Sequence, residues 1–203
     1  SVYVINGSYK NTNFYDNGVT VMMAGKSKQG VCRTYLRFTD FTAKIKGKYV
    51  DSATLTMYET GSSQSGQTIE ARRVTENWTR PGLKWSNRPG YSTNYGNVKT
   101  TGTAKKARSI NLTEYARECA SGKITSYGVM LKNADETKSY GQFYSSRASS
   151  NRPKMSVTYY DGPTTASSVS VTPQYANNNH QKTLHVNWAG ISSHSLNLSL
   201  IHI

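Results

Sequence analysis

Histidine is missing from the first 160 residues of this 203-residue chain, and all four histidines lie beyond that point, beginning with His180. The larger part of the chain therefore has no imidazole general base, no histidine-activated nucleophile and no histidine metal ligand. It also lacks any run of about 18 consecutive apolar residues, the length that a transmembrane helix needs. These absences exclude histidine-based hydrolases, histidine-ligated zinc enzymes and a membrane-spanning helix from this part of the chain.

Cysteine is equally scarce, since the chain contains only Cys32 and Cys119. Two cysteines cannot form a zinc site by themselves. They could form one disulfide if the domain is secreted into an oxidising compartment. The alternative, which we prefer, is that they are two small buried hydrophobic residues.

Acidic residues are few, and basic residues are unevenly distributed. The chain has 11 Asp and Glu against 25 Lys and Arg, a formal net charge of +14, and Lys182 is the only basic residue after position 160. A positive field of this size suits an anionic partner, such as an acidic polysaccharide, a cell-wall polymer or nucleic acid. The alternative is that the charge serves solubility alone.

Short segments in which apolar and polar residues alternate recur as far as Tyr160. In the segment 32–38, Cys32, Thr34, Leu36 and Phe38 are expected on one face of a strand. Further strands are predicted at 19–23, 53–58, 69–75, 129–132, 142–146 and 155–159. Strands of this kind with one polar face predict an all-β fold, an antiparallel β-sandwich.

Two regions depart from this pattern. Ile110–Gly122 has apolar residues at helical spacing, which predicts one short helix near Thr113–Ala120. From Gly162 onward Lys182 is the only Lys, Arg, Asp or Glu, and two strands are predicted at 169–173 and 183–190. Trp188 on the second strand is typical of the core of an immunoglobulin-like or fibronectin-like sandwich. We therefore predict one domain over residues 1–161 and the truncated start of a fibronectin type III-like domain over residues 162–203.

Eight phrases along the chain carry a resemblance to a known family. They are Arg33–Phe38, Val50–Tyr58, Arg73–Trp78, Leu83–Pro89, Ile110–Thr113, Tyr127–Lys132, Tyr144–Arg147 and Arg152–Tyr159. Their succession resembles the DNRLRE domain, a jelly-roll, carbohydrate-binding-module-like domain of bacterial wall-associated and RHS-repeat proteins. The resemblance implies the same sandwich fold, and it implies a following fibronectin-like unit whose start is similar to Leu184–Ser195.

The sequence also departs from that family. The hexapeptide that names the family is absent, Asn111 replaces an Asp before the short helix, and Cys119 occupies the position of a Trp. The ligand of a relative therefore cannot be assigned to this chain. The last six residues, Leu198–Ile203, are similar to translated sequencing-adapter sequence, so we expect them to be artefactual.

Arg33, Tyr35 and Arg37 are expected to share the solvent-facing side of their strand. Guanidinium groups bind carboxylates in bidentate geometry, so this stripe is suited to uronate sugars. The alternative is that the stripe is a second sheet face covered by the loop Ala43–Lys48.

Trp78 and Trp85 are seven residues apart and flank a Pro- and Gly-containing loop. Their rings could stack on the apolar faces of sugars, or they could hold the loop to the edge of the sandwich. The second interpretation is favoured, because the pair corresponds to framework positions in the family that the chain resembles.

Tyr91, Tyr95 and Lys99 lie in a segment rich in Gly, Ser and Asn, which predicts a loop. Tyr91 is a candidate sugar-binding residue. Aromatic and basic residues in this arrangement also suit single-stranded nucleic acid, but the chain has no RNP-like, KH or helix-turn-helix pattern. We therefore expect no specific nucleic-acid partner.

No metal site is predicted. Asp16-Asn17-Gly18 and Asp135-Glu136 offer oxygen ligands for a structural calcium ion, but neither has the spaced acids of a calcium loop. Asp16-Asn17-Gly18 is more simply a turn.

Charge, pattern and resemblance together predict a non-catalytic extracellular module of a bacterial multidomain surface or secreted protein. We expect it to bind an anionic polysaccharide or cell-wall glycan without a cofactor, next to further domains of a longer chain. One alternative is a purely structural spacer in a wall-associated RHS-type protein. A weaker one is a polysaccharide lyase with a tyrosine base.

Overall fold

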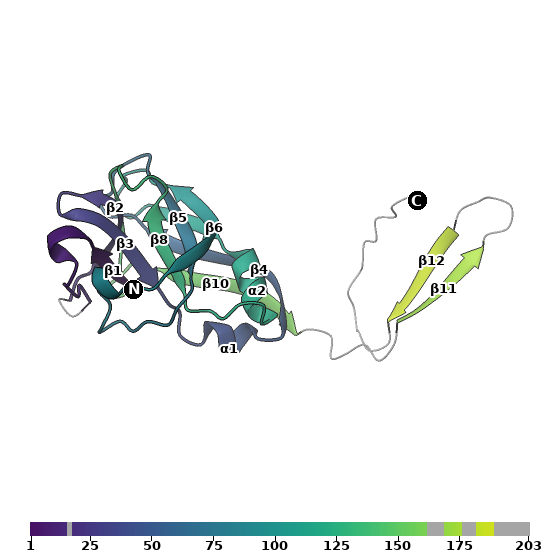
Figure 1. The fold of residues 1–203 in the computed structure, drawn as a ribbon. Helices are drawn as coiled ribbons and strands as arrows, with labels where there is room; N and C mark the ends of the chain where they lie inside the picture. Colours follow the sequence, from purple (N-terminus) through teal and green to yellow (C-terminus); the bar gives the residue numbers. More distant parts are fainter. Residues whose placement is uncertain (16–17, 162–168, 176–181, 189–203) are drawn as a thin grey trace. The chain divides into compact units, whose positions relative to one another are not determined.

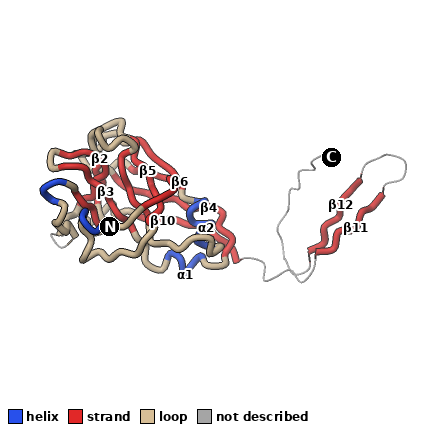
Figure 2. Tube along the Cα trace, viewed as in Figure 1, coloured by secondary structure: helices blue, strands red, loops and turns tan. Residues whose placement is uncertain are grey.

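The computed structural model describes residues 1–15, 18–161, 169–175 and 182–188 (Figure 1). The chain divides into two compact units, Ser1–Tyr160 and Asp161–Ile203. Strands make up most of the regular structure of the first unit, and its helices are short (Figure 2). The two units are treated separately below.

Most strands of the first unit belong to one large sheet. It contains β1 (Val2–Ile5), β2 (Val21–Ser27), β3 (Gly30–Leu36), β5 (Thr68–Val74), β6 (Tyr91–Lys99), β8 (Val129–Asn133) and β9 (Gly141–Tyr144). The strand order is β6-β5-β8-β3-β2-β9, and β1 pairs with β3 (Figure 1). Neighbouring strands pair antiparallel. Strands β1 and β6 were not predicted as strands.

A smaller sheet has the order β10-β4-β7 and contains β10 (Lys154–Asp161), β4 (Lys48–Tyr58) and β7 (Ala107–Asn111). In β4 the buried residues Ala53, Leu55 and Met57 alternate with half-buried polar ones, as expected for a strand with one face in the core. The prediction of an all-β sandwich is confirmed.

The two α-helices are α1 (Phe41–Ile45) and α2 (Thr113–Ala120), and single 3-10 turns occur at Gly7–Tyr9 and Trp85–Asn87. The prediction of α2 is confirmed. The expectation of only one short helix, with Ala43–Lys48 as a loop, is wrong, because α1 overlaps that segment. Helix α1 has five residues and buries only Ile45, so it is too short to show helical periodicity in the sequence.

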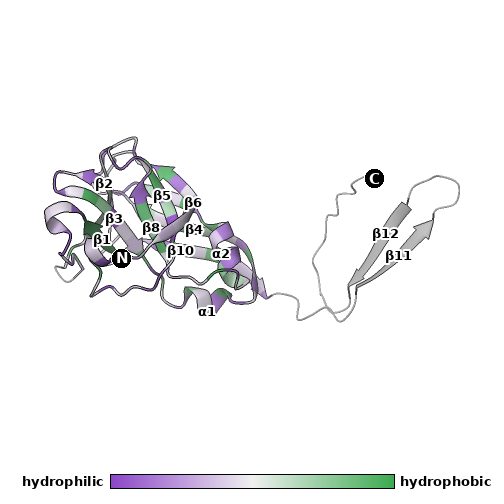
Figure 3. Ribbon diagram, viewed as in Figure 1, coloured by the Kyte–Doolittle hydropathy of each residue, from purple (hydrophilic) through white to green (hydrophobic). Residues whose placement is uncertain are grey.

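The main core lies between the two sheets and extends beneath α2. Its fully buried members include Leu55, Ile69, Leu131 and Phe143 from the sheets and Tyr115 from the helix. Figure 3 shows hydrophobic residues along the strands of this interior. Burial of each such side chain contributes about 2 kcal/mol to folding, so this core is the main source of stability.

Both cysteines are buried and free. Cys32 packs with Tyr3 and Ile5 in a small separate cluster, whereas Cys119 lies on α2 in the main core. The preferred interpretation as two small buried residues is confirmed, and burial raises the pKa of the Cys119 thiol to about 11.

In the second unit the structure describes one antiparallel hairpin, β11 (Val169–Tyr175) and β12 (Lys182–Trp188), with Val169 opposite Trp188. The two strands lie where the sequence predicted them. That they begin a fibronectin-like domain, with the Trp188 side chain as its core residue, stays a prediction. The Leu198–Ile203 segment lies outside the described residues.

Candidate functional site

The six candidate residues predicted from the sequence lie in one cluster on the outer face of the large sheet. The cluster contains Arg33, Tyr35, Arg37, Trp78, Trp85 and Tyr91. It surrounds a second apolar core that is separate from the one between the sheets. The sequence therefore identified residues that are close in space, although they come from three separate segments.

The expectation that Arg33 and Tyr35 face solvent is wrong. Arg33 is only 9% exposed, and its Nε and Nη2 donate to the two carboxylate oxygens of Glu136 at 2.7 and 2.8 Å. Tyr35 is fully buried, with its ring 5.8 Å from Trp78 in an edge-to-face contact. The cover is the segment 75–90, which packs on this sheet face, and not the Ala43–Lys48 segment proposed as the alternative.

The two tryptophans of the cluster support the framework interpretation. Trp78 is 6% exposed and donates from its indole Nε1 to the Tyr127 carbonyl oxygen at 2.7 Å. The Trp85 ring has the Arg33 guanidinium at 4.9 Å and the Arg88 guanidinium at 4.2 Å from its centroid. Guanidinium groups over an aromatic face compete with a sugar for the same surface.

Arg37 is exposed, as predicted, and it donates to the Asn77 side chain at 2.9 Å while its guanidinium lies 5.0 Å from the centroid of Trp78. Tyr91 is 37% exposed, with Arg33 and Arg72 at 5.1 and 5.8 Å from its ring centroid. Contact of this exposed rim with a glycan stays a prediction.

Tyr95 belongs to strand β6, so the prediction of a loop for this segment is wrong. Residues 91–99 pair with β5, and the pairing is irregular around Arg72. The segment is an edge strand of the sheet, and its exposed side chains include Thr93, Asn94 and Asn97. Such a strand has the composition of a loop, and it is ordered by hydrogen bonds to its neighbour, which the composition does not show.

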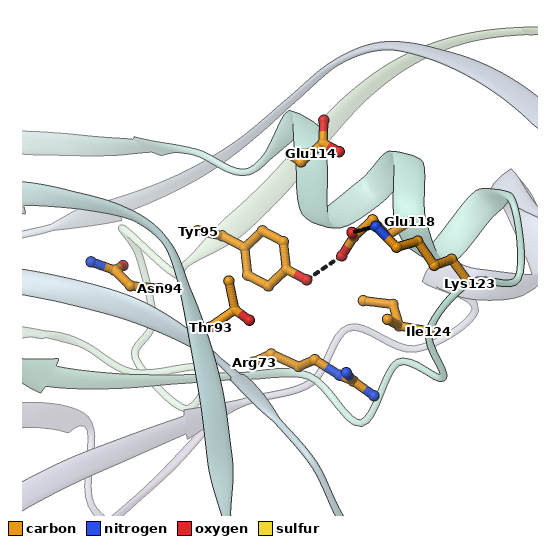
Figure 4. A pocket seen from close by; sticks show the side chains of 8 residues that line it. All are labelled: Arg73, Thr93, Asn94, Tyr95, Glu114, Glu118, Lys123 and Ile124. Atoms are coloured by element: carbon orange, nitrogen blue, oxygen red, sulfur yellow. Dashed lines mark hydrogen bonds and ion pairs between the residues drawn. The ribbon is translucent and has the colours of Figure 1, made fainter.

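An open cleft of about 540 Å³ lies between β6 and α2 (Figure 4). Its lining residues are Arg73, Thr93, Asn94, Tyr95, Glu114, Glu118, Lys123 and Ile124. A second hollow of about 590 Å³ shares Tyr95 and Glu114 with the first. Asn97, Asn111 and Arg117 also line it. The two together form one groove around Tyr95, which we call the Tyr95 cleft.

Strand alternation explains why Arg73 points into this cleft. Ile69 and Ala71 of β5 face the core between the sheets, so Arg73 follows on the same face. Its neighbour Arg72 lies on the outer face, where its Nε donates to Glu70 at 2.7 Å. The Nε of Arg73 is buried, and no described residue accepts a hydrogen bond from it.

Glu118 anchors the other side of the cleft. It follows Glu114 by one helical turn, so both carboxylates are on one face of α2. One Glu118 oxygen accepts from Lys123 Nζ and the other from the Tyr95 hydroxyl (Figure 4). The hydrogen bonds from Lys123 and Tyr95 lower the pKa of Glu118. Burial, and then its bond to Glu118, raise the pKa of Tyr95, so its hydroxyl stays protonated.

The Tyr95 cleft thus combines an aromatic ring, amide and hydroxyl groups, the three carboxylates of Asp51, Glu114 and Glu118, and the Arg73 guanidinium, whose Nε has no acceptor. Sequence reasoning named Tyr95 only as part of a loop and did not single out Arg73, Glu114 or Glu118. The signals were the Arg72-Arg73 pair, which must point to opposite faces of a strand, and the two glutamates at helical spacing. Neither signal shows that β6 and α2 lie side by side.

Within residues 1–15 and 18–161 and the described hairpin, no group of three or more His, Cys, Asp or Glu side chains is placed to hold a metal ion. Asp16 and Asn17 lie outside the described residues, and Asp135 accepts from Thr137 Oγ1 at 2.6 Å. None of the described helices is both long and apolar enough to cross a membrane.

A β-sandwich with an open polar cleft is an arrangement suited to binding a ligand. The chain belongs to carbohydrate-binding module family 96, whose model matches residues 1–159. Families of this kind are non-catalytic binding modules, and the prediction of a carbohydrate-binding domain is confirmed at that level. No curated protein matches the chain.

Proposed function

We propose that residues 1–160 bind an acidic polysaccharide in the Tyr95 cleft. The observation that carries the proposal is the Arg73 guanidinium, which has a buried Nε without a hydrogen-bond acceptor at the wall of an open cleft. A buried donor without a partner costs about 1–3 kcal/mol. A ligand carboxylate in the cleft would supply the missing acceptor once the half-buried Arg73 side chain turns its Nε toward the cleft, and that would remove the cost.

The remaining groups of the cleft suit a sugar. Asn94 and Thr93 offer donors and acceptors for hydroxyl groups, and Glu114 is exposed and can accept from them. The Tyr95 ring is held edge-to-face on Tyr115 at 5.3 Å, so it is a rigid platform for an apolar sugar face. The volume of about 540 Å³ is within the usual range of small-ligand sites.

The charge of the whole domain favours an acidic rather than a neutral glycan. The net charge of +14 would concentrate a polyanion around the domain and increase its association rate. We further propose that the domain acts outside the cell or at the cell wall, as one module of a longer bacterial surface or secreted protein. Long acidic polysaccharides are the partners that such a field would meet there.

The test is calorimetric titration of oligogalacturonate into wild type and single variants at low salt. Arg73→Ala should weaken binding by about tenfold or more, the value of one charge-assisted hydrogen-bonded contact. Arg73→Lys keeps the positive charge but loses the planar guanidinium that can donate two parallel hydrogen bonds to a carboxylate. Its affinity should therefore lie between those of Arg73→Ala and wild type. Arg37→Ala removes the same charge from an exposed site outside the cleft and should change affinity less than twofold.

The opposite order of affinity losses would reject the Tyr95 cleft as the binding site. If Arg37→Ala weakens binding more than Arg73→Ala, the exposed rim of the outer-face cluster is the site. If wild type binds no acidic oligosaccharide even at low salt, where screening is least, the structural-spacer alternative stands and the basic surface serves solubility.

A further inference from the structure

A second cleft lies at the opposite edge of the large sheet, against β2 and β9. It has a volume of about 700 Å³. Its lining residues are Tyr3, Val21, Met23, Lys26, Ser27, Lys28, Gln29, Gln64, Ser139, Tyr140 and Gln142. The lining thus contains two lysines, three glutamines, two tyrosines and no acidic residue. We infer that this β2–β9 cleft is a second binding site for a segment of acidic glycan, which makes the domain bivalent.

The two lysines are available to a ligand. Lys26 and Lys28 are exposed, and neither forms an ion pair within the described residues. The acids that precede the lining residues Gln64 and Ser139 in the chain have hydrogen-bond partners of their own. Glu136 is bound to Arg33, and Asp135 accepts from Thr137. Glu59 is fully buried and accepts from the Thr101 and Gly102 backbone nitrogens at 2.8 Å. The cleft therefore has an uncompensated positive charge.

The amide and aromatic groups of this cleft are held in place by the fold. Gln142 is fixed because its Oε1 accepts from Thr60 Oγ1 at 2.5 Å, which leaves its amide nitrogen to donate. The side-chain nitrogen of Gln64 donates to the Ser62 carbonyl oxygen at 3.4 Å, and its backbone nitrogen donates to the Tyr140 carbonyl oxygen at 3.1 Å. Tyr3 is stacked on Phe14 with ring centroids 4.6 Å apart. Fixed amides beside an aromatic floor are suited to sugar hydroxyls and ring faces.

Gly25 allows one wall of this cleft to form. Its φ is +119°, and a Cβ there would lie 2.5 Å from the Ser139 carbonyl oxygen and 2.8 Å from the Tyr140 Cα. The absence of a side chain lets the segment before β9 lie directly against β2, where Lys26 and Ser139 form a parallel bridge. The chain thus brings Tyr140 into the same cleft as Lys26 of β2 and Lys28 of the turn that follows it.

The β2–β9 cleft and the Tyr95 cleft cannot hold the same sugar. Strands β9 and β6 are the two ends of the strand order, with five strand intervals between them. At about 4.8 Å per interval this is about 24 Å along the sheet. Figure 1 shows β2 and β6 on opposite sides of β3, β8 and β5. The inference of bivalency rests on the proposed function, but ligand binding at the β2–β9 cleft can be observed independently.

The experiment is a ¹⁵N–¹H NMR titration of the domain with digalacturonate, which is much shorter than the separation of the clefts, with cellobiose as the neutral control. The side-chain amides of Gln64 and Gln142 report on the β2–β9 cleft, and that of Asn94 reports on the Tyr95 cleft. Both the glutamine signals and the Asn94 signal should shift with digalacturonate.

The double variant Lys26→Gln with Lys28→Gln tests the two lysines. It should raise the dissociation constant obtained from the Gln64 and Gln142 signals at least tenfold, and it should leave the constant obtained from the Asn94 signal unchanged. Lys44→Gln with Lys46→Gln, which has the same spacing and charge change on exposed residues outside the cleft, should affect neither constant.

Each outcome decides one of the two hypotheses. If only Asn94 shifts, or if the glutamine shifts persist in the Lys26 and Lys28 double variant, the second site is rejected and the proposed function stands. If only the glutamine signals shift, and their shifts depend on the two lysines, the β2–β9 cleft is a glycan site and the Tyr95 cleft is not. If cellobiose produces the same shifts with the same affinity, the inference of an acidic ligand is wrong.

Discussion

The two faces of strand β5 place neighbouring arginines in different electrostatic environments. Arg72 is on the outer face, paired with Glu70 and next to the Tyr91 ring. Arg73 is on the inner face at the mouth of the sandwich, where its Nε has no acceptor. Residue type and sequence position are almost identical, so the difference arises from the face on which each side chain emerges.

The outer-face cluster differs in the same way from the Tyr95 cleft as a whole. In the cluster, Arg33 has a bidentate partner in Glu136, and the Trp85 ring is covered by two guanidinium groups. Paired charges and covered rings stabilise the fold but leave few groups for a ligand. In the cleft, no described residue accepts a hydrogen bond from the Nε of Arg73, and the Tyr95 ring lines the open space, so both are available to a ligand. A basic, aromatic surface is therefore a candidate site only where its groups are unpaired.

The largest expected effect is on Trp78. Trp78→Ala removes a buried indole and leaves the Tyr127 carbonyl without its donor, so we expect a loss of about 4 kcal/mol in the free energy of unfolding. Trp85→Ala, at a half-buried position, should cost about half as much. Urea denaturation measures both. A loss below about 1 kcal/mol for Trp78→Ala would show that this ring is not framework and would reopen it as a sugar-binding residue.

Substitutions of Arg33 and Arg73 should have different effects on the free energy of unfolding. Arg33→Ala leaves the partly buried Glu136 without its partner and removes two ring contacts, so it should lower the free energy of unfolding by about 3 kcal/mol. Arg73→Ala removes the cost of the unpaired Nε but also the packing of the half-buried side-chain stem, and the two effects oppose each other, so it should change the free energy of unfolding by less than about 1 kcal/mol. Urea denaturation of the two variants under the same conditions tests this. Equal losses would contradict the distinction between paired and unpaired arginines.

The smallest effect concerns Glu118. Its pKa is lowered from an ordinary value of 4.5, chiefly by Lys123 and then by Tyr95, so the unfolded chain binds a proton here at a higher pH than the folded one. The resulting stabilisation is present above about pH 4.5 and is lost as the pH falls through the lower folded value. An NMR titration of the Glu118 carboxyl should show its pKa rising toward 4.5 in Lys123→Ala. An unchanged pKa in that variant would mean that the Lys123 contact does not persist in solution.

The sandwich could be predicted because its main signal is local. Alternation in the segment 53–58 reflects one buried face, and the helical spacing in Thr113–Ala120 reflects another. Strand β6 could not be predicted in this way. Its residues are mostly exposed on an edge strand, so its order comes from pairing with β5, and its own composition is that of a loop.

The site could be predicted only in part. Alternation correctly placed Arg33, Tyr35 and Arg37 on one face, and the structure adds Trp78, Trp85 and Tyr91 to the same cluster. Alternation cannot show whether another segment of the chain packs on the outer face of the strand. A strand has two faces whether or not another segment packs on the outer one, and here the segment 75–90 does so.

The sequence by itself determined the fold class, the positive charge and the absence of histidine chemistry from the larger unit, because these depend on composition and on local periodicity. The tertiary structure alone decided which arginines are paired. Glu136 reaches Arg33 across 103 residues of sequence, and Glu118 meets Tyr95 only because α2 packs beside β6. An ion pair depends on distance in space, and only the packing of distant segments sets that distance, so Arg73 could be recognised as unpaired only once the chain was folded.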